Sequence, residues 1–228
     1  YSWRNMRLYR YLLGDSVEDD ERIGGMRTGA TGFYDVHDSL GLVVYSTMSS
    51  PRSNLPFCEG GGRVRDLAVD SIANYGPDDR PPRPSRDFRK AHRHPFTARR
   101  SLFAAAFSPD GDRLAAVQHH YDQFYLCLLD TTGENLVRVY PDTADTASPI
   151  QTIYTVDWSP DGHRVAISFV ERTGDRKIGI YDTLDGSFVL LCDRERDERD
   201  PRFKDDGKHL YFSSDRTGIY NVYRYVFD

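Results

Sequence analysis

Short apolar runs separated by tight turns fill much of the chain. The run LFAAAF at Leu102–Phe107 enters the turn SPDG, and DRLAAVQ at 112–118 leaves it. Such runs, broken by proline and glycine, are typical of β-strands joined by hairpin turns. Two further strands are expected at 123–130 and 135–141, with TTGE as the turn between them. Residues 102–141 therefore predict a unit of four short antiparallel strands.

This unit occurs more than once. FSPDGDRLAAV at 107–117 is followed by WSPDGHRVAIS at 158–168 and FKDDGKHLYFS at 203–213, so equivalent positions lie 51 and 45 residues apart. A weaker copy is expected at 33–50, where the turn at 37–41 lacks the proline. A repeat of this length is typical of propellers and related arrays.

The turn residues of the three copies have a clear backbone role. Proline fixes φ near −65° at the second turn position, aspartate accepts hydrogen bonds from nearby backbone, and glycine tolerates the positive φ that ends the turn. We therefore expect these aspartates to shape turns and to take no part in acid–base chemistry. The structural turn residues are Asp110, Gly111, Asp161, Gly162, Asp206 and Gly207.

The copies, together with YFSSDRTGIYNVYRY at 211–225, resemble the repeat of TolB-type (PD40, WD-like) β-propellers. The resemblance covers 102–228 well and 1–50 weakly, and it does not cover 51–100. It implies an all-β propeller of four-stranded antiparallel blades, with about four repeats in the chain. RLYRY at 7–11 and NVYRY at 221–225 both fall on the third strand of a repeat, so we expect a segment of a larger propeller.

The repeats also predict the domain organisation. We expect one propeller domain over 1–228, interrupted by a Pro/Arg-rich loop insertion at 76–100. The expected blade parts are 1–29, 30–75, 98–150, 151–198 and 199–228.

The resemblance implies a function as well. Propellers of this type occur in the periplasmic TolB protein, in other bacterial cell-envelope proteins, and as non-catalytic domains beside serine peptidases. A non-catalytic module that binds a protein or peptide partner is therefore expected, in the periplasm or another extracytoplasmic part of the cell envelope. Two alternatives stay open: the propeller domain of a larger enzyme, such as a peptidase whose catalytic domain lies outside this chain, and a structural subunit of a larger assembly.

The insertion carries the candidate binding residues. It contains five prolines, and 80–100 holds seven arginines, one lysine and two histidines against one acid. Long loops without secondary structure are often functional, and arginine is favoured at protein interfaces, so a partner contact is expected; a solvated surface loop is the alternative. The candidate partner-binding residues are Arg86, Arg89, Lys90, His92, Arg93 and His94.

Composition and motifs exclude several other classes. The net charge of −5 argues against a nucleic-acid partner. The three cysteines show no metal spacing, and HExxH, GxSxG and phosphate-loop motifs are absent, so no catalytic residue, metal ligand or cofactor is expected. No apolar run is long enough for a membrane span. The charged stretch DRERDERD at 193–200 is interpreted as a solvated linker between two blades.

Overall fold

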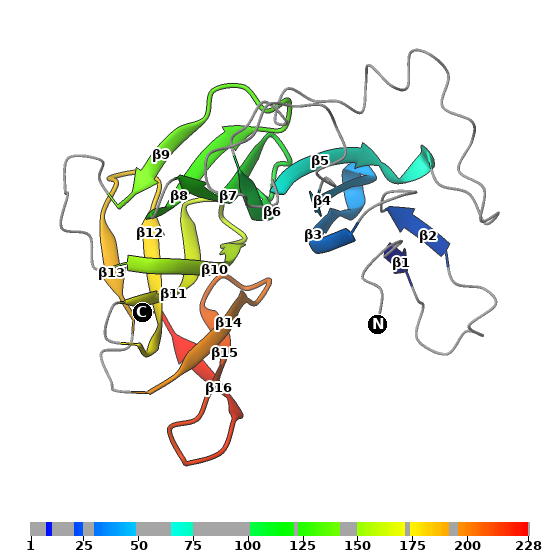
Figure 1. Cartoon of the computed structure of the whole chain (residues 1–228). Coiled ribbons are helices and arrows are strands. Elements are labelled where there is room, and N and C mark those ends of the chain that lie inside the picture. The colour runs from blue at the N-terminus through cyan, green and yellow to red at the C-terminus, as the bar shows by residue number, and fades with distance from the viewer. Residues whose placement is uncertain are drawn as a thin grey trace. The chain divides into compact units, whose positions relative to one another are not determined.

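The computed structural model describes residues 8–10, 21–24, 30–48, 65–74, 101–120, 123–141, 150–171, 174–191 and 196–227 (Figure 1). These residues form β-strands, two short 3-10 helices and turns. The strands are arranged in five separate antiparallel sheets in which neighbours in the chain are neighbours in the sheet. The all-β propeller fold predicted from the repeats is confirmed.

Two compact units make up the chain, 1–103 and 104–228. In unit one, a two-stranded sheet precedes a three-stranded sheet, and its strands β2 and β4 are in contact. The expected turn at 37–41 is a 3-10 helix that ends at Gly41, where φ is +60°. The elements of unit one are β1 (Leu8–Arg10), β2 (Glu21–Gly24), β3 (Ala30–His37), η2 (Asp38–Leu40), β4 (Leu42–Met48), β5 (Arg65–Ser71) and η3 (Ile72–Asn74).

Unit two holds three sheets, which we call the first, second and third blade. β6, the first strand of the first blade, begins at the boundary between the units. The first blade is β6 (Leu102–Phe107), β7 (Arg113–His120), β8 (Gln123–Asp130) and β9 (Val137–Tyr140). The second is β10 (Ile150–Trp158), β11 (Arg164–Glu171), β12 (Arg176–Asp182) and β13 (Phe188–Leu190). The third is β14 (Glu198–Phe203), β15 (His209–Ser214) and β16 (Asn221–Val226).

The turn between the first two strands of each blade is held by side chains of the repeat. In the first blade, Oγ of Ser108 lies 2.5 Å from Oδ1 of Asp110 and accepts the Arg113 N–H at 2.9 Å. The hydrogen bond from Ser108 lowers the pKa of Asp110, so its carboxylate is ionised and keeps accepting at neutral pH. Gly111 closes the turn with φ of +75°.

The second and third turns repeat this arrangement. Ser159 contacts Asp161 and the Arg164 N–H at 2.5 and 2.8 Å, and Gly162 has φ of +72°. The third turn has lysine where the others have serine: Nζ of Lys204 lies 3.0 Å from Oδ2 of Asp206. The structure therefore places all three predicted turn aspartates and glycines, Asp206 and Gly207 included, in the hairpin turns.

The blades of unit two pack face to face. β10 contacts β7 and β8 of the first blade, and β14 contacts β10, β11 and β12 of the second. Between the second and third blades the core contains Ala166, Ile178 and Ile180 on one side, and Leu210 and Phe212 on the other. Burial of these apolar faces is the main stabilising contribution to the stack.

Polar contacts of the repeated arginine add to this packing. Arg113 of the first blade donates to the carbonyl of Gly162 in the second, at 3.4 Å, and its guanidinium lies 5.1 Å from the ring of Trp158. Arg164 of the second blade likewise donates to the carbonyl of Gly207 in the third, at 3.0 Å. In the first and second blades, the arginine two residues after the turn glycine thus contacts the turn of the next blade.

We expect Gly179→Ala to lower the free energy of unfolding by about 1–3 kcal/mol, because it overpacks the edge of the second blade. A Cβ at Gly179 would lie 2.0 Å from Cζ of Phe188, so the phenyl ring would have to move. That ring also stacks on Tyr140 of the first blade, with centroids 3.7 Å apart. Urea unfolding of the single variant checks the prediction. In a Phe188→Ala background the same substitution should cost little, and an equal cost in both backgrounds would contradict this account.

Candidate binding site

The six residues predicted to bind a partner, and the whole insertion at 76–100, lie outside the described residues. The assignment of a partner contact to Arg86, Arg89, Lys90, His92, Arg93 and His94 therefore stays a prediction.

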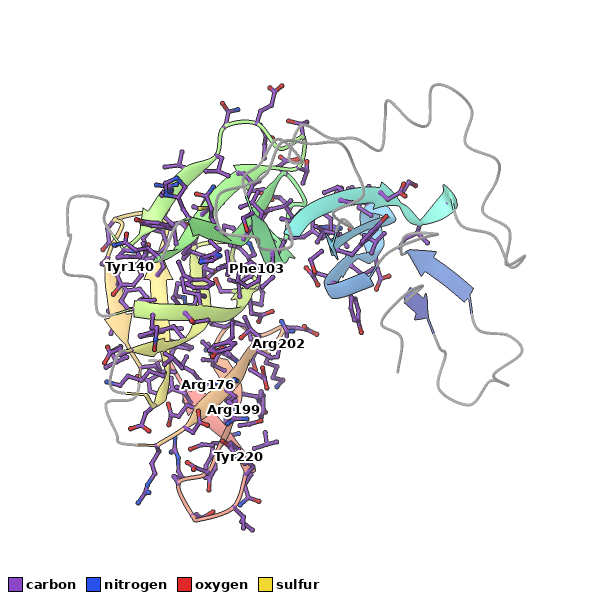
Figure 2. All side chains as sticks on the ribbon, viewed as in Figure 1. Phe103, Tyr140, Arg176, Arg199, Arg202 and Tyr220 are labelled. Carbon is purple, nitrogen blue, oxygen red and sulfur yellow. The ribbon has the colours of Figure 1, made fainter. Side chains whose placement is uncertain are left out.

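Among the described residues, arginine and tyrosine side chains gather where the third blade begins. Figure 2 labels three of them, Arg176, Arg199 and Tyr220, in the lower part of unit two. Arg176 comes from β12 of the second blade, Arg199 from β14, and Tyr220 precedes β16. Asp197 joins them, and we call these four residues the Arg–Tyr cluster.

Asp197 is the centre of the cluster. Its Oδ2 accepts a hydrogen bond from the Tyr220 hydroxyl at 2.6 Å and from Nε of Arg199 at 3.0 Å. The guanidinium of Arg199 also lies over the Tyr220 ring, 4.6 Å from its centroid. Arg176 stacks in the same way on Tyr154, at 3.9 Å. Each arginine of the cluster thus lies on the face of a tyrosine, Tyr220 within the cluster and Tyr154 beside Arg176, and this stacking restricts the orientation of both guanidinium groups.

A buried ion pair supports the cluster from within the blade. Glu198, which follows Asp197 in the chain, is 1% exposed, and its Oε1 accepts a hydrogen bond from Nη2 of Arg216 at 2.6 Å. The Arg216 guanidinium lies 4.3 Å from the centroid of the Tyr223 ring, and its Nε donates a hydrogen bond to Oγ of Ser214 at 3.2 Å. Oδ1 of Asp197 and Oε2 of Glu198 are buried without a hydrogen-bond partner in the described part of the chain.

The protonation states of the cluster are fixed at neutral pH. Burial on its own would raise the pKa of Asp197, but hydrogen bonds from Arg199 and Tyr220 and the charge of Arg176 hold that pKa below its ordinary value. The hydrogen bond to Asp197 raises the pKa of Tyr220. A general acid or base works best with a pKa near the operating pH. Asp197 and Tyr220 are both shifted away from that range, so the cluster is suited to binding.

Across the described ranges no group of three or more His, Cys, Asp or Glu side chains is placed to hold a metal ion. In the same part of the chain, no helix has the length and apolar character needed to cross a bilayer.

Sequence reasoning missed this cluster and was wrong about part of 193–200. Glu198 is not in a solvated linker; it begins β14 and is buried with Arg216. A run of mixed charges looks the same whether it is solvated or forms buried pairs, so its pattern could not decide between them. One signal was available: RTG occurs at 172–174 and again at 216–218, in equivalent connections of the second and third blades.

Comparison with solved structures agrees with the fold, although no protein-family profile matches the chain. A protein from Agrobacterium tumefaciens described as TolB matches 92% of the chain and 62% of its own length, at 16% identity and a TM-score of 0.63. TolB from Acinetobacter baumannii matches 82% of the chain and 39% of its own length, at 17% identity and a TM-score of 0.52.

A peptidase is similar to a comparable degree. Prolyl oligopeptidase B from Galerina marginata matches 86% of the chain and 27% of its own length, at 13% identity and a TM-score of 0.53. The chain therefore spans less than two thirds of the length of each of these proteins. At these identities the likeness concerns the fold, which is that of a TolB-like β-propeller.

Proposed function

Starting from the TolB-like propeller fold, we propose that this chain is a non-catalytic module that binds a protein or peptide partner in the bacterial cell envelope. Its contact surfaces are the Arg–Tyr cluster and the basic insertion at 76–100. The observation that carries the proposal is the cluster itself, in which the Arg199 guanidinium lies on the Tyr220 ring and both side chains donate hydrogen bonds to the ionised Asp197.

The composition of the cluster favours a macromolecular partner. Arginine and tyrosine are enriched at the centre of protein interfaces, where rigid side chains give contact area at a low cost in conformational entropy. Tyr220 is 47% exposed, so a partner can contact it without displacing the blade core. The likeness to two TolB structures supports a location in the cell envelope.

Peptide binding tests the proposal directly. Peptides selected from a phage-displayed library against the wild-type chain should bind it in fluorescence anisotropy. Tyr220→Ala should weaken their binding about tenfold or more, which is the effect of losing an interface aromatic residue. The triple variant R89S/K90S/R93S should weaken it as well.

Lys208→Ser is the matched control, because Lys208 is an exposed lysine in the turn at the opposite end of β15. Its affinity should stay within about twofold of wild type, the range of a surface substitution outside an interface. Unchanged thermal unfolding of the variants would show that they remain folded. If no peptide is selected, or if both test variants bind as Lys208→Ser does, the proposal is wrong.

A propeller domain of a larger peptidase is the second candidate, and the likeness to prolyl oligopeptidase B favours it. It predicts that the native polypeptide includes a hydrolase domain as well as these 228 residues. Mass spectrometry of the native protein with terminal peptide mapping would decide between the two, because a binding module requires no such domain.

A further inference from the structure

Arg176 of the Arg–Tyr cluster differs from the other described arginines of unit two that lie over aromatic rings. Each of the others also donates a hydrogen bond to an oxygen of the chain. These donor–acceptor pairs are Arg113–Gly162, Arg138–Gln118, Arg164–Gly207, Arg199–Asp197 and Arg216–Glu198. The Arg176 guanidinium lies 3.9 Å from the centroid of the Tyr154 ring, yet within the described ranges it forms no hydrogen bond or ion pair. It is therefore held on a ring with its N–H donors available.

Arg176 lies at the boundary between the second and third blades, where β12 contacts β14 (Figure 2). Arg176, Ile178 and Ile180 alternate along β12, so they share one face of the second blade. The two isoleucines are buried there against the third blade. Arg176 begins the strand and is half-buried. Its charge lowers the pKa of Asp197 in the third blade, although no ion pair joins these two described residues. Both neighbouring blades thus form the surroundings of Arg176.

A β-bulge in β10 brings Tyr154 to Arg176. The register passes from Ile153 opposite Phe169 to Thr155 opposite Ser168, so Tyr154 is the unpaired residue of the bulge. A bulge can turn a side chain away from the regular alternation of its strand. The Tyr154 ring thereby reaches the guanidinium on β12, two strands away in the sheet.

The third blade has the same pair with its two residue types exchanged. Tyr154 and Arg199 both lie eight residues before the turn glycine of their blade. Arg176 and Tyr220 are equivalent in the strand pairing of the following hairpin. In both blades the arginine lies on the tyrosine ring. The pair is therefore a repeated feature of these two blades.

The two copies of the pair differ in their carboxylate. In the third blade, Asp197 stands two residues before Arg199 and accepts a hydrogen bond from its Nε at 3.0 Å. The second blade has Thr152 at the position of Asp197, two residues before Tyr154. No carboxylate of the described residues forms an ion pair with Arg176 in its place. The second copy is thus an arginine–tyrosine pair without the anion that the third copy holds.

We propose that Arg176 binds a carboxylate of the partner, so that the partner completes the second pair as Asp197 completes the third. This inference rests on the proposed binding function and names the chemistry that the Arg–Tyr cluster recognises. Arginine suits a carboxylate because its planar guanidinium can donate two parallel hydrogen bonds. Stacking on Tyr154 orients the guanidinium before the partner arrives, which lowers the entropic cost of binding. The carboxylate comes from an acidic side chain or from the C-terminus of a peptide, and the experiment distinguishes these sources.

Fluorescein-labelled synthetic copies of the peptides selected from the library against the wild-type chain are the probes. Each carboxylate of a peptide is replaced by an amide in turn: glutamate by glutamine, aspartate by asparagine, and the free C-terminus by a C-terminal amide. In fluorescence anisotropy, one of these changes should weaken binding to the wild-type chain about tenfold, the effect of losing one charged contact at an interface. Which change has this effect identifies the source of the carboxylate.

A double-mutant cycle assigns that carboxylate to Arg176. Arg176→Gln should weaken binding of the unmodified peptide about tenfold, and the decisive amide change should then have less than about twofold further effect. Arg176→Lys keeps the charge but loses the parallel hydrogen bonds, so it should weaken binding as well, and it serves as the test if Arg176→Gln does not fold.

Lys208→Gln is the matched control, because it removes the same charge from an exposed turn. Binding should stay within about twofold of wild type, and the amide change should keep its full effect. Equal losses in Arg176→Gln and Lys208→Gln would mean non-specific attraction and would overturn the inference.

The outcomes separate this inference from the proposed function. If selected peptides bind and lose affinity in Tyr220→Ala or R89S/K90S/R93S, but none has a carboxylate coupled to Arg176, the carboxylate site is refuted and the proposed function stands. If no peptide is selected, both are refuted.

Discussion

Replacing Arg216 with methionine should lower the free energy of unfolding by about 3–5 kcal/mol, the cost of leaving one partner of a buried ion pair alone. The Glu198 side chain is only 2% exposed, and Arg216 approaches its Oε1 at 2.6 Å. The other carboxylate oxygen has no hydrogen-bond partner among the described residues, so they offer nothing that could take the place of the guanidinium. Methionine fills a similar volume, which keeps the loss of packing small.

Urea unfolding followed by circular dichroism measures this effect. The double variant E198M/R216M should recover much of the lost stability, because two apolar side chains of similar volume can replace a buried pair. Arg202→Met is the matched control: its pair with Asp157 has an arginine 59% exposed, so its loss should cost less than about 1 kcal/mol. If Arg216→Met costs no more than Arg202→Met, the Glu198–Arg216 pair is not a buried determinant of the third blade.

The hairpins and their turns could be predicted from the sequence because they depend on local chemistry. Proline, aspartate and glycine in SPDG each restrict the backbone or bind it within a few residues. Ser108 and Asp110 show this in the structure, since their contacts span no more than five residues. The apolar runs on either side of each turn then predict the paired strands.

Contacts between blades could not be predicted in the same way. Arg113 and Arg164 occupy equivalent positions of the repeat, and the sequence alone gives no reason to pair them with glycine carbonyls 43 to 49 residues further on. That pairing depends on the angle at which one sheet packs on the next. The sequence shows that Tyr211 of the third repeat stands at the position of Ala166 in the second. What that difference does to the packing depends on which face of the blade is covered.

The candidate site was harder to predict than the fold. Asp197, Arg199 and Tyr220 are separated by up to 23 residues, and they meet because the third blade folds its connection back toward the start of β14. Each residue alone is an ordinary surface type. The insertion at 76–100 shows the opposite case: its composition is distinctive, but it lies outside the repeat, so the fold does not predict which residues it meets.

Replacing Trp158 with alanine should lower the free energy of unfolding by about 3–5 kcal/mol, the range for removing a large buried aromatic side chain. Trp158 is 6% exposed at the end of β10, and it ties the first and second blades together in two ways. Its indole N–H donates to the carbonyl of Ala106 at 3.1 Å, and its ring carries the guanidinium of Arg113. Alanine removes both contacts and leaves a cavity between the blades.

Trp158→Phe separates these contributions, because phenylalanine keeps a smaller aromatic ring and loses the N–H donor. It should cost about 1–3 kcal/mol, since the carbonyl of Ala106 loses a buried hydrogen bond and some volume is lost. A double-mutant cycle that combines Arg113→Met with Trp158→Ala should give a coupling free energy of about 0.5–1 kcal/mol between the two side chains. This is the range of a cation–π contact that is partly exposed. Chemical denaturation measures the free energy of unfolding of the wild type, the two single variants and the double variant. If Trp158→Phe costs as much as Trp158→Ala, the hydrogen bond to the first blade dominates; if the coupling is zero, Arg113 stabilises the stack through the carbonyl of Gly162 and not through the indole ring.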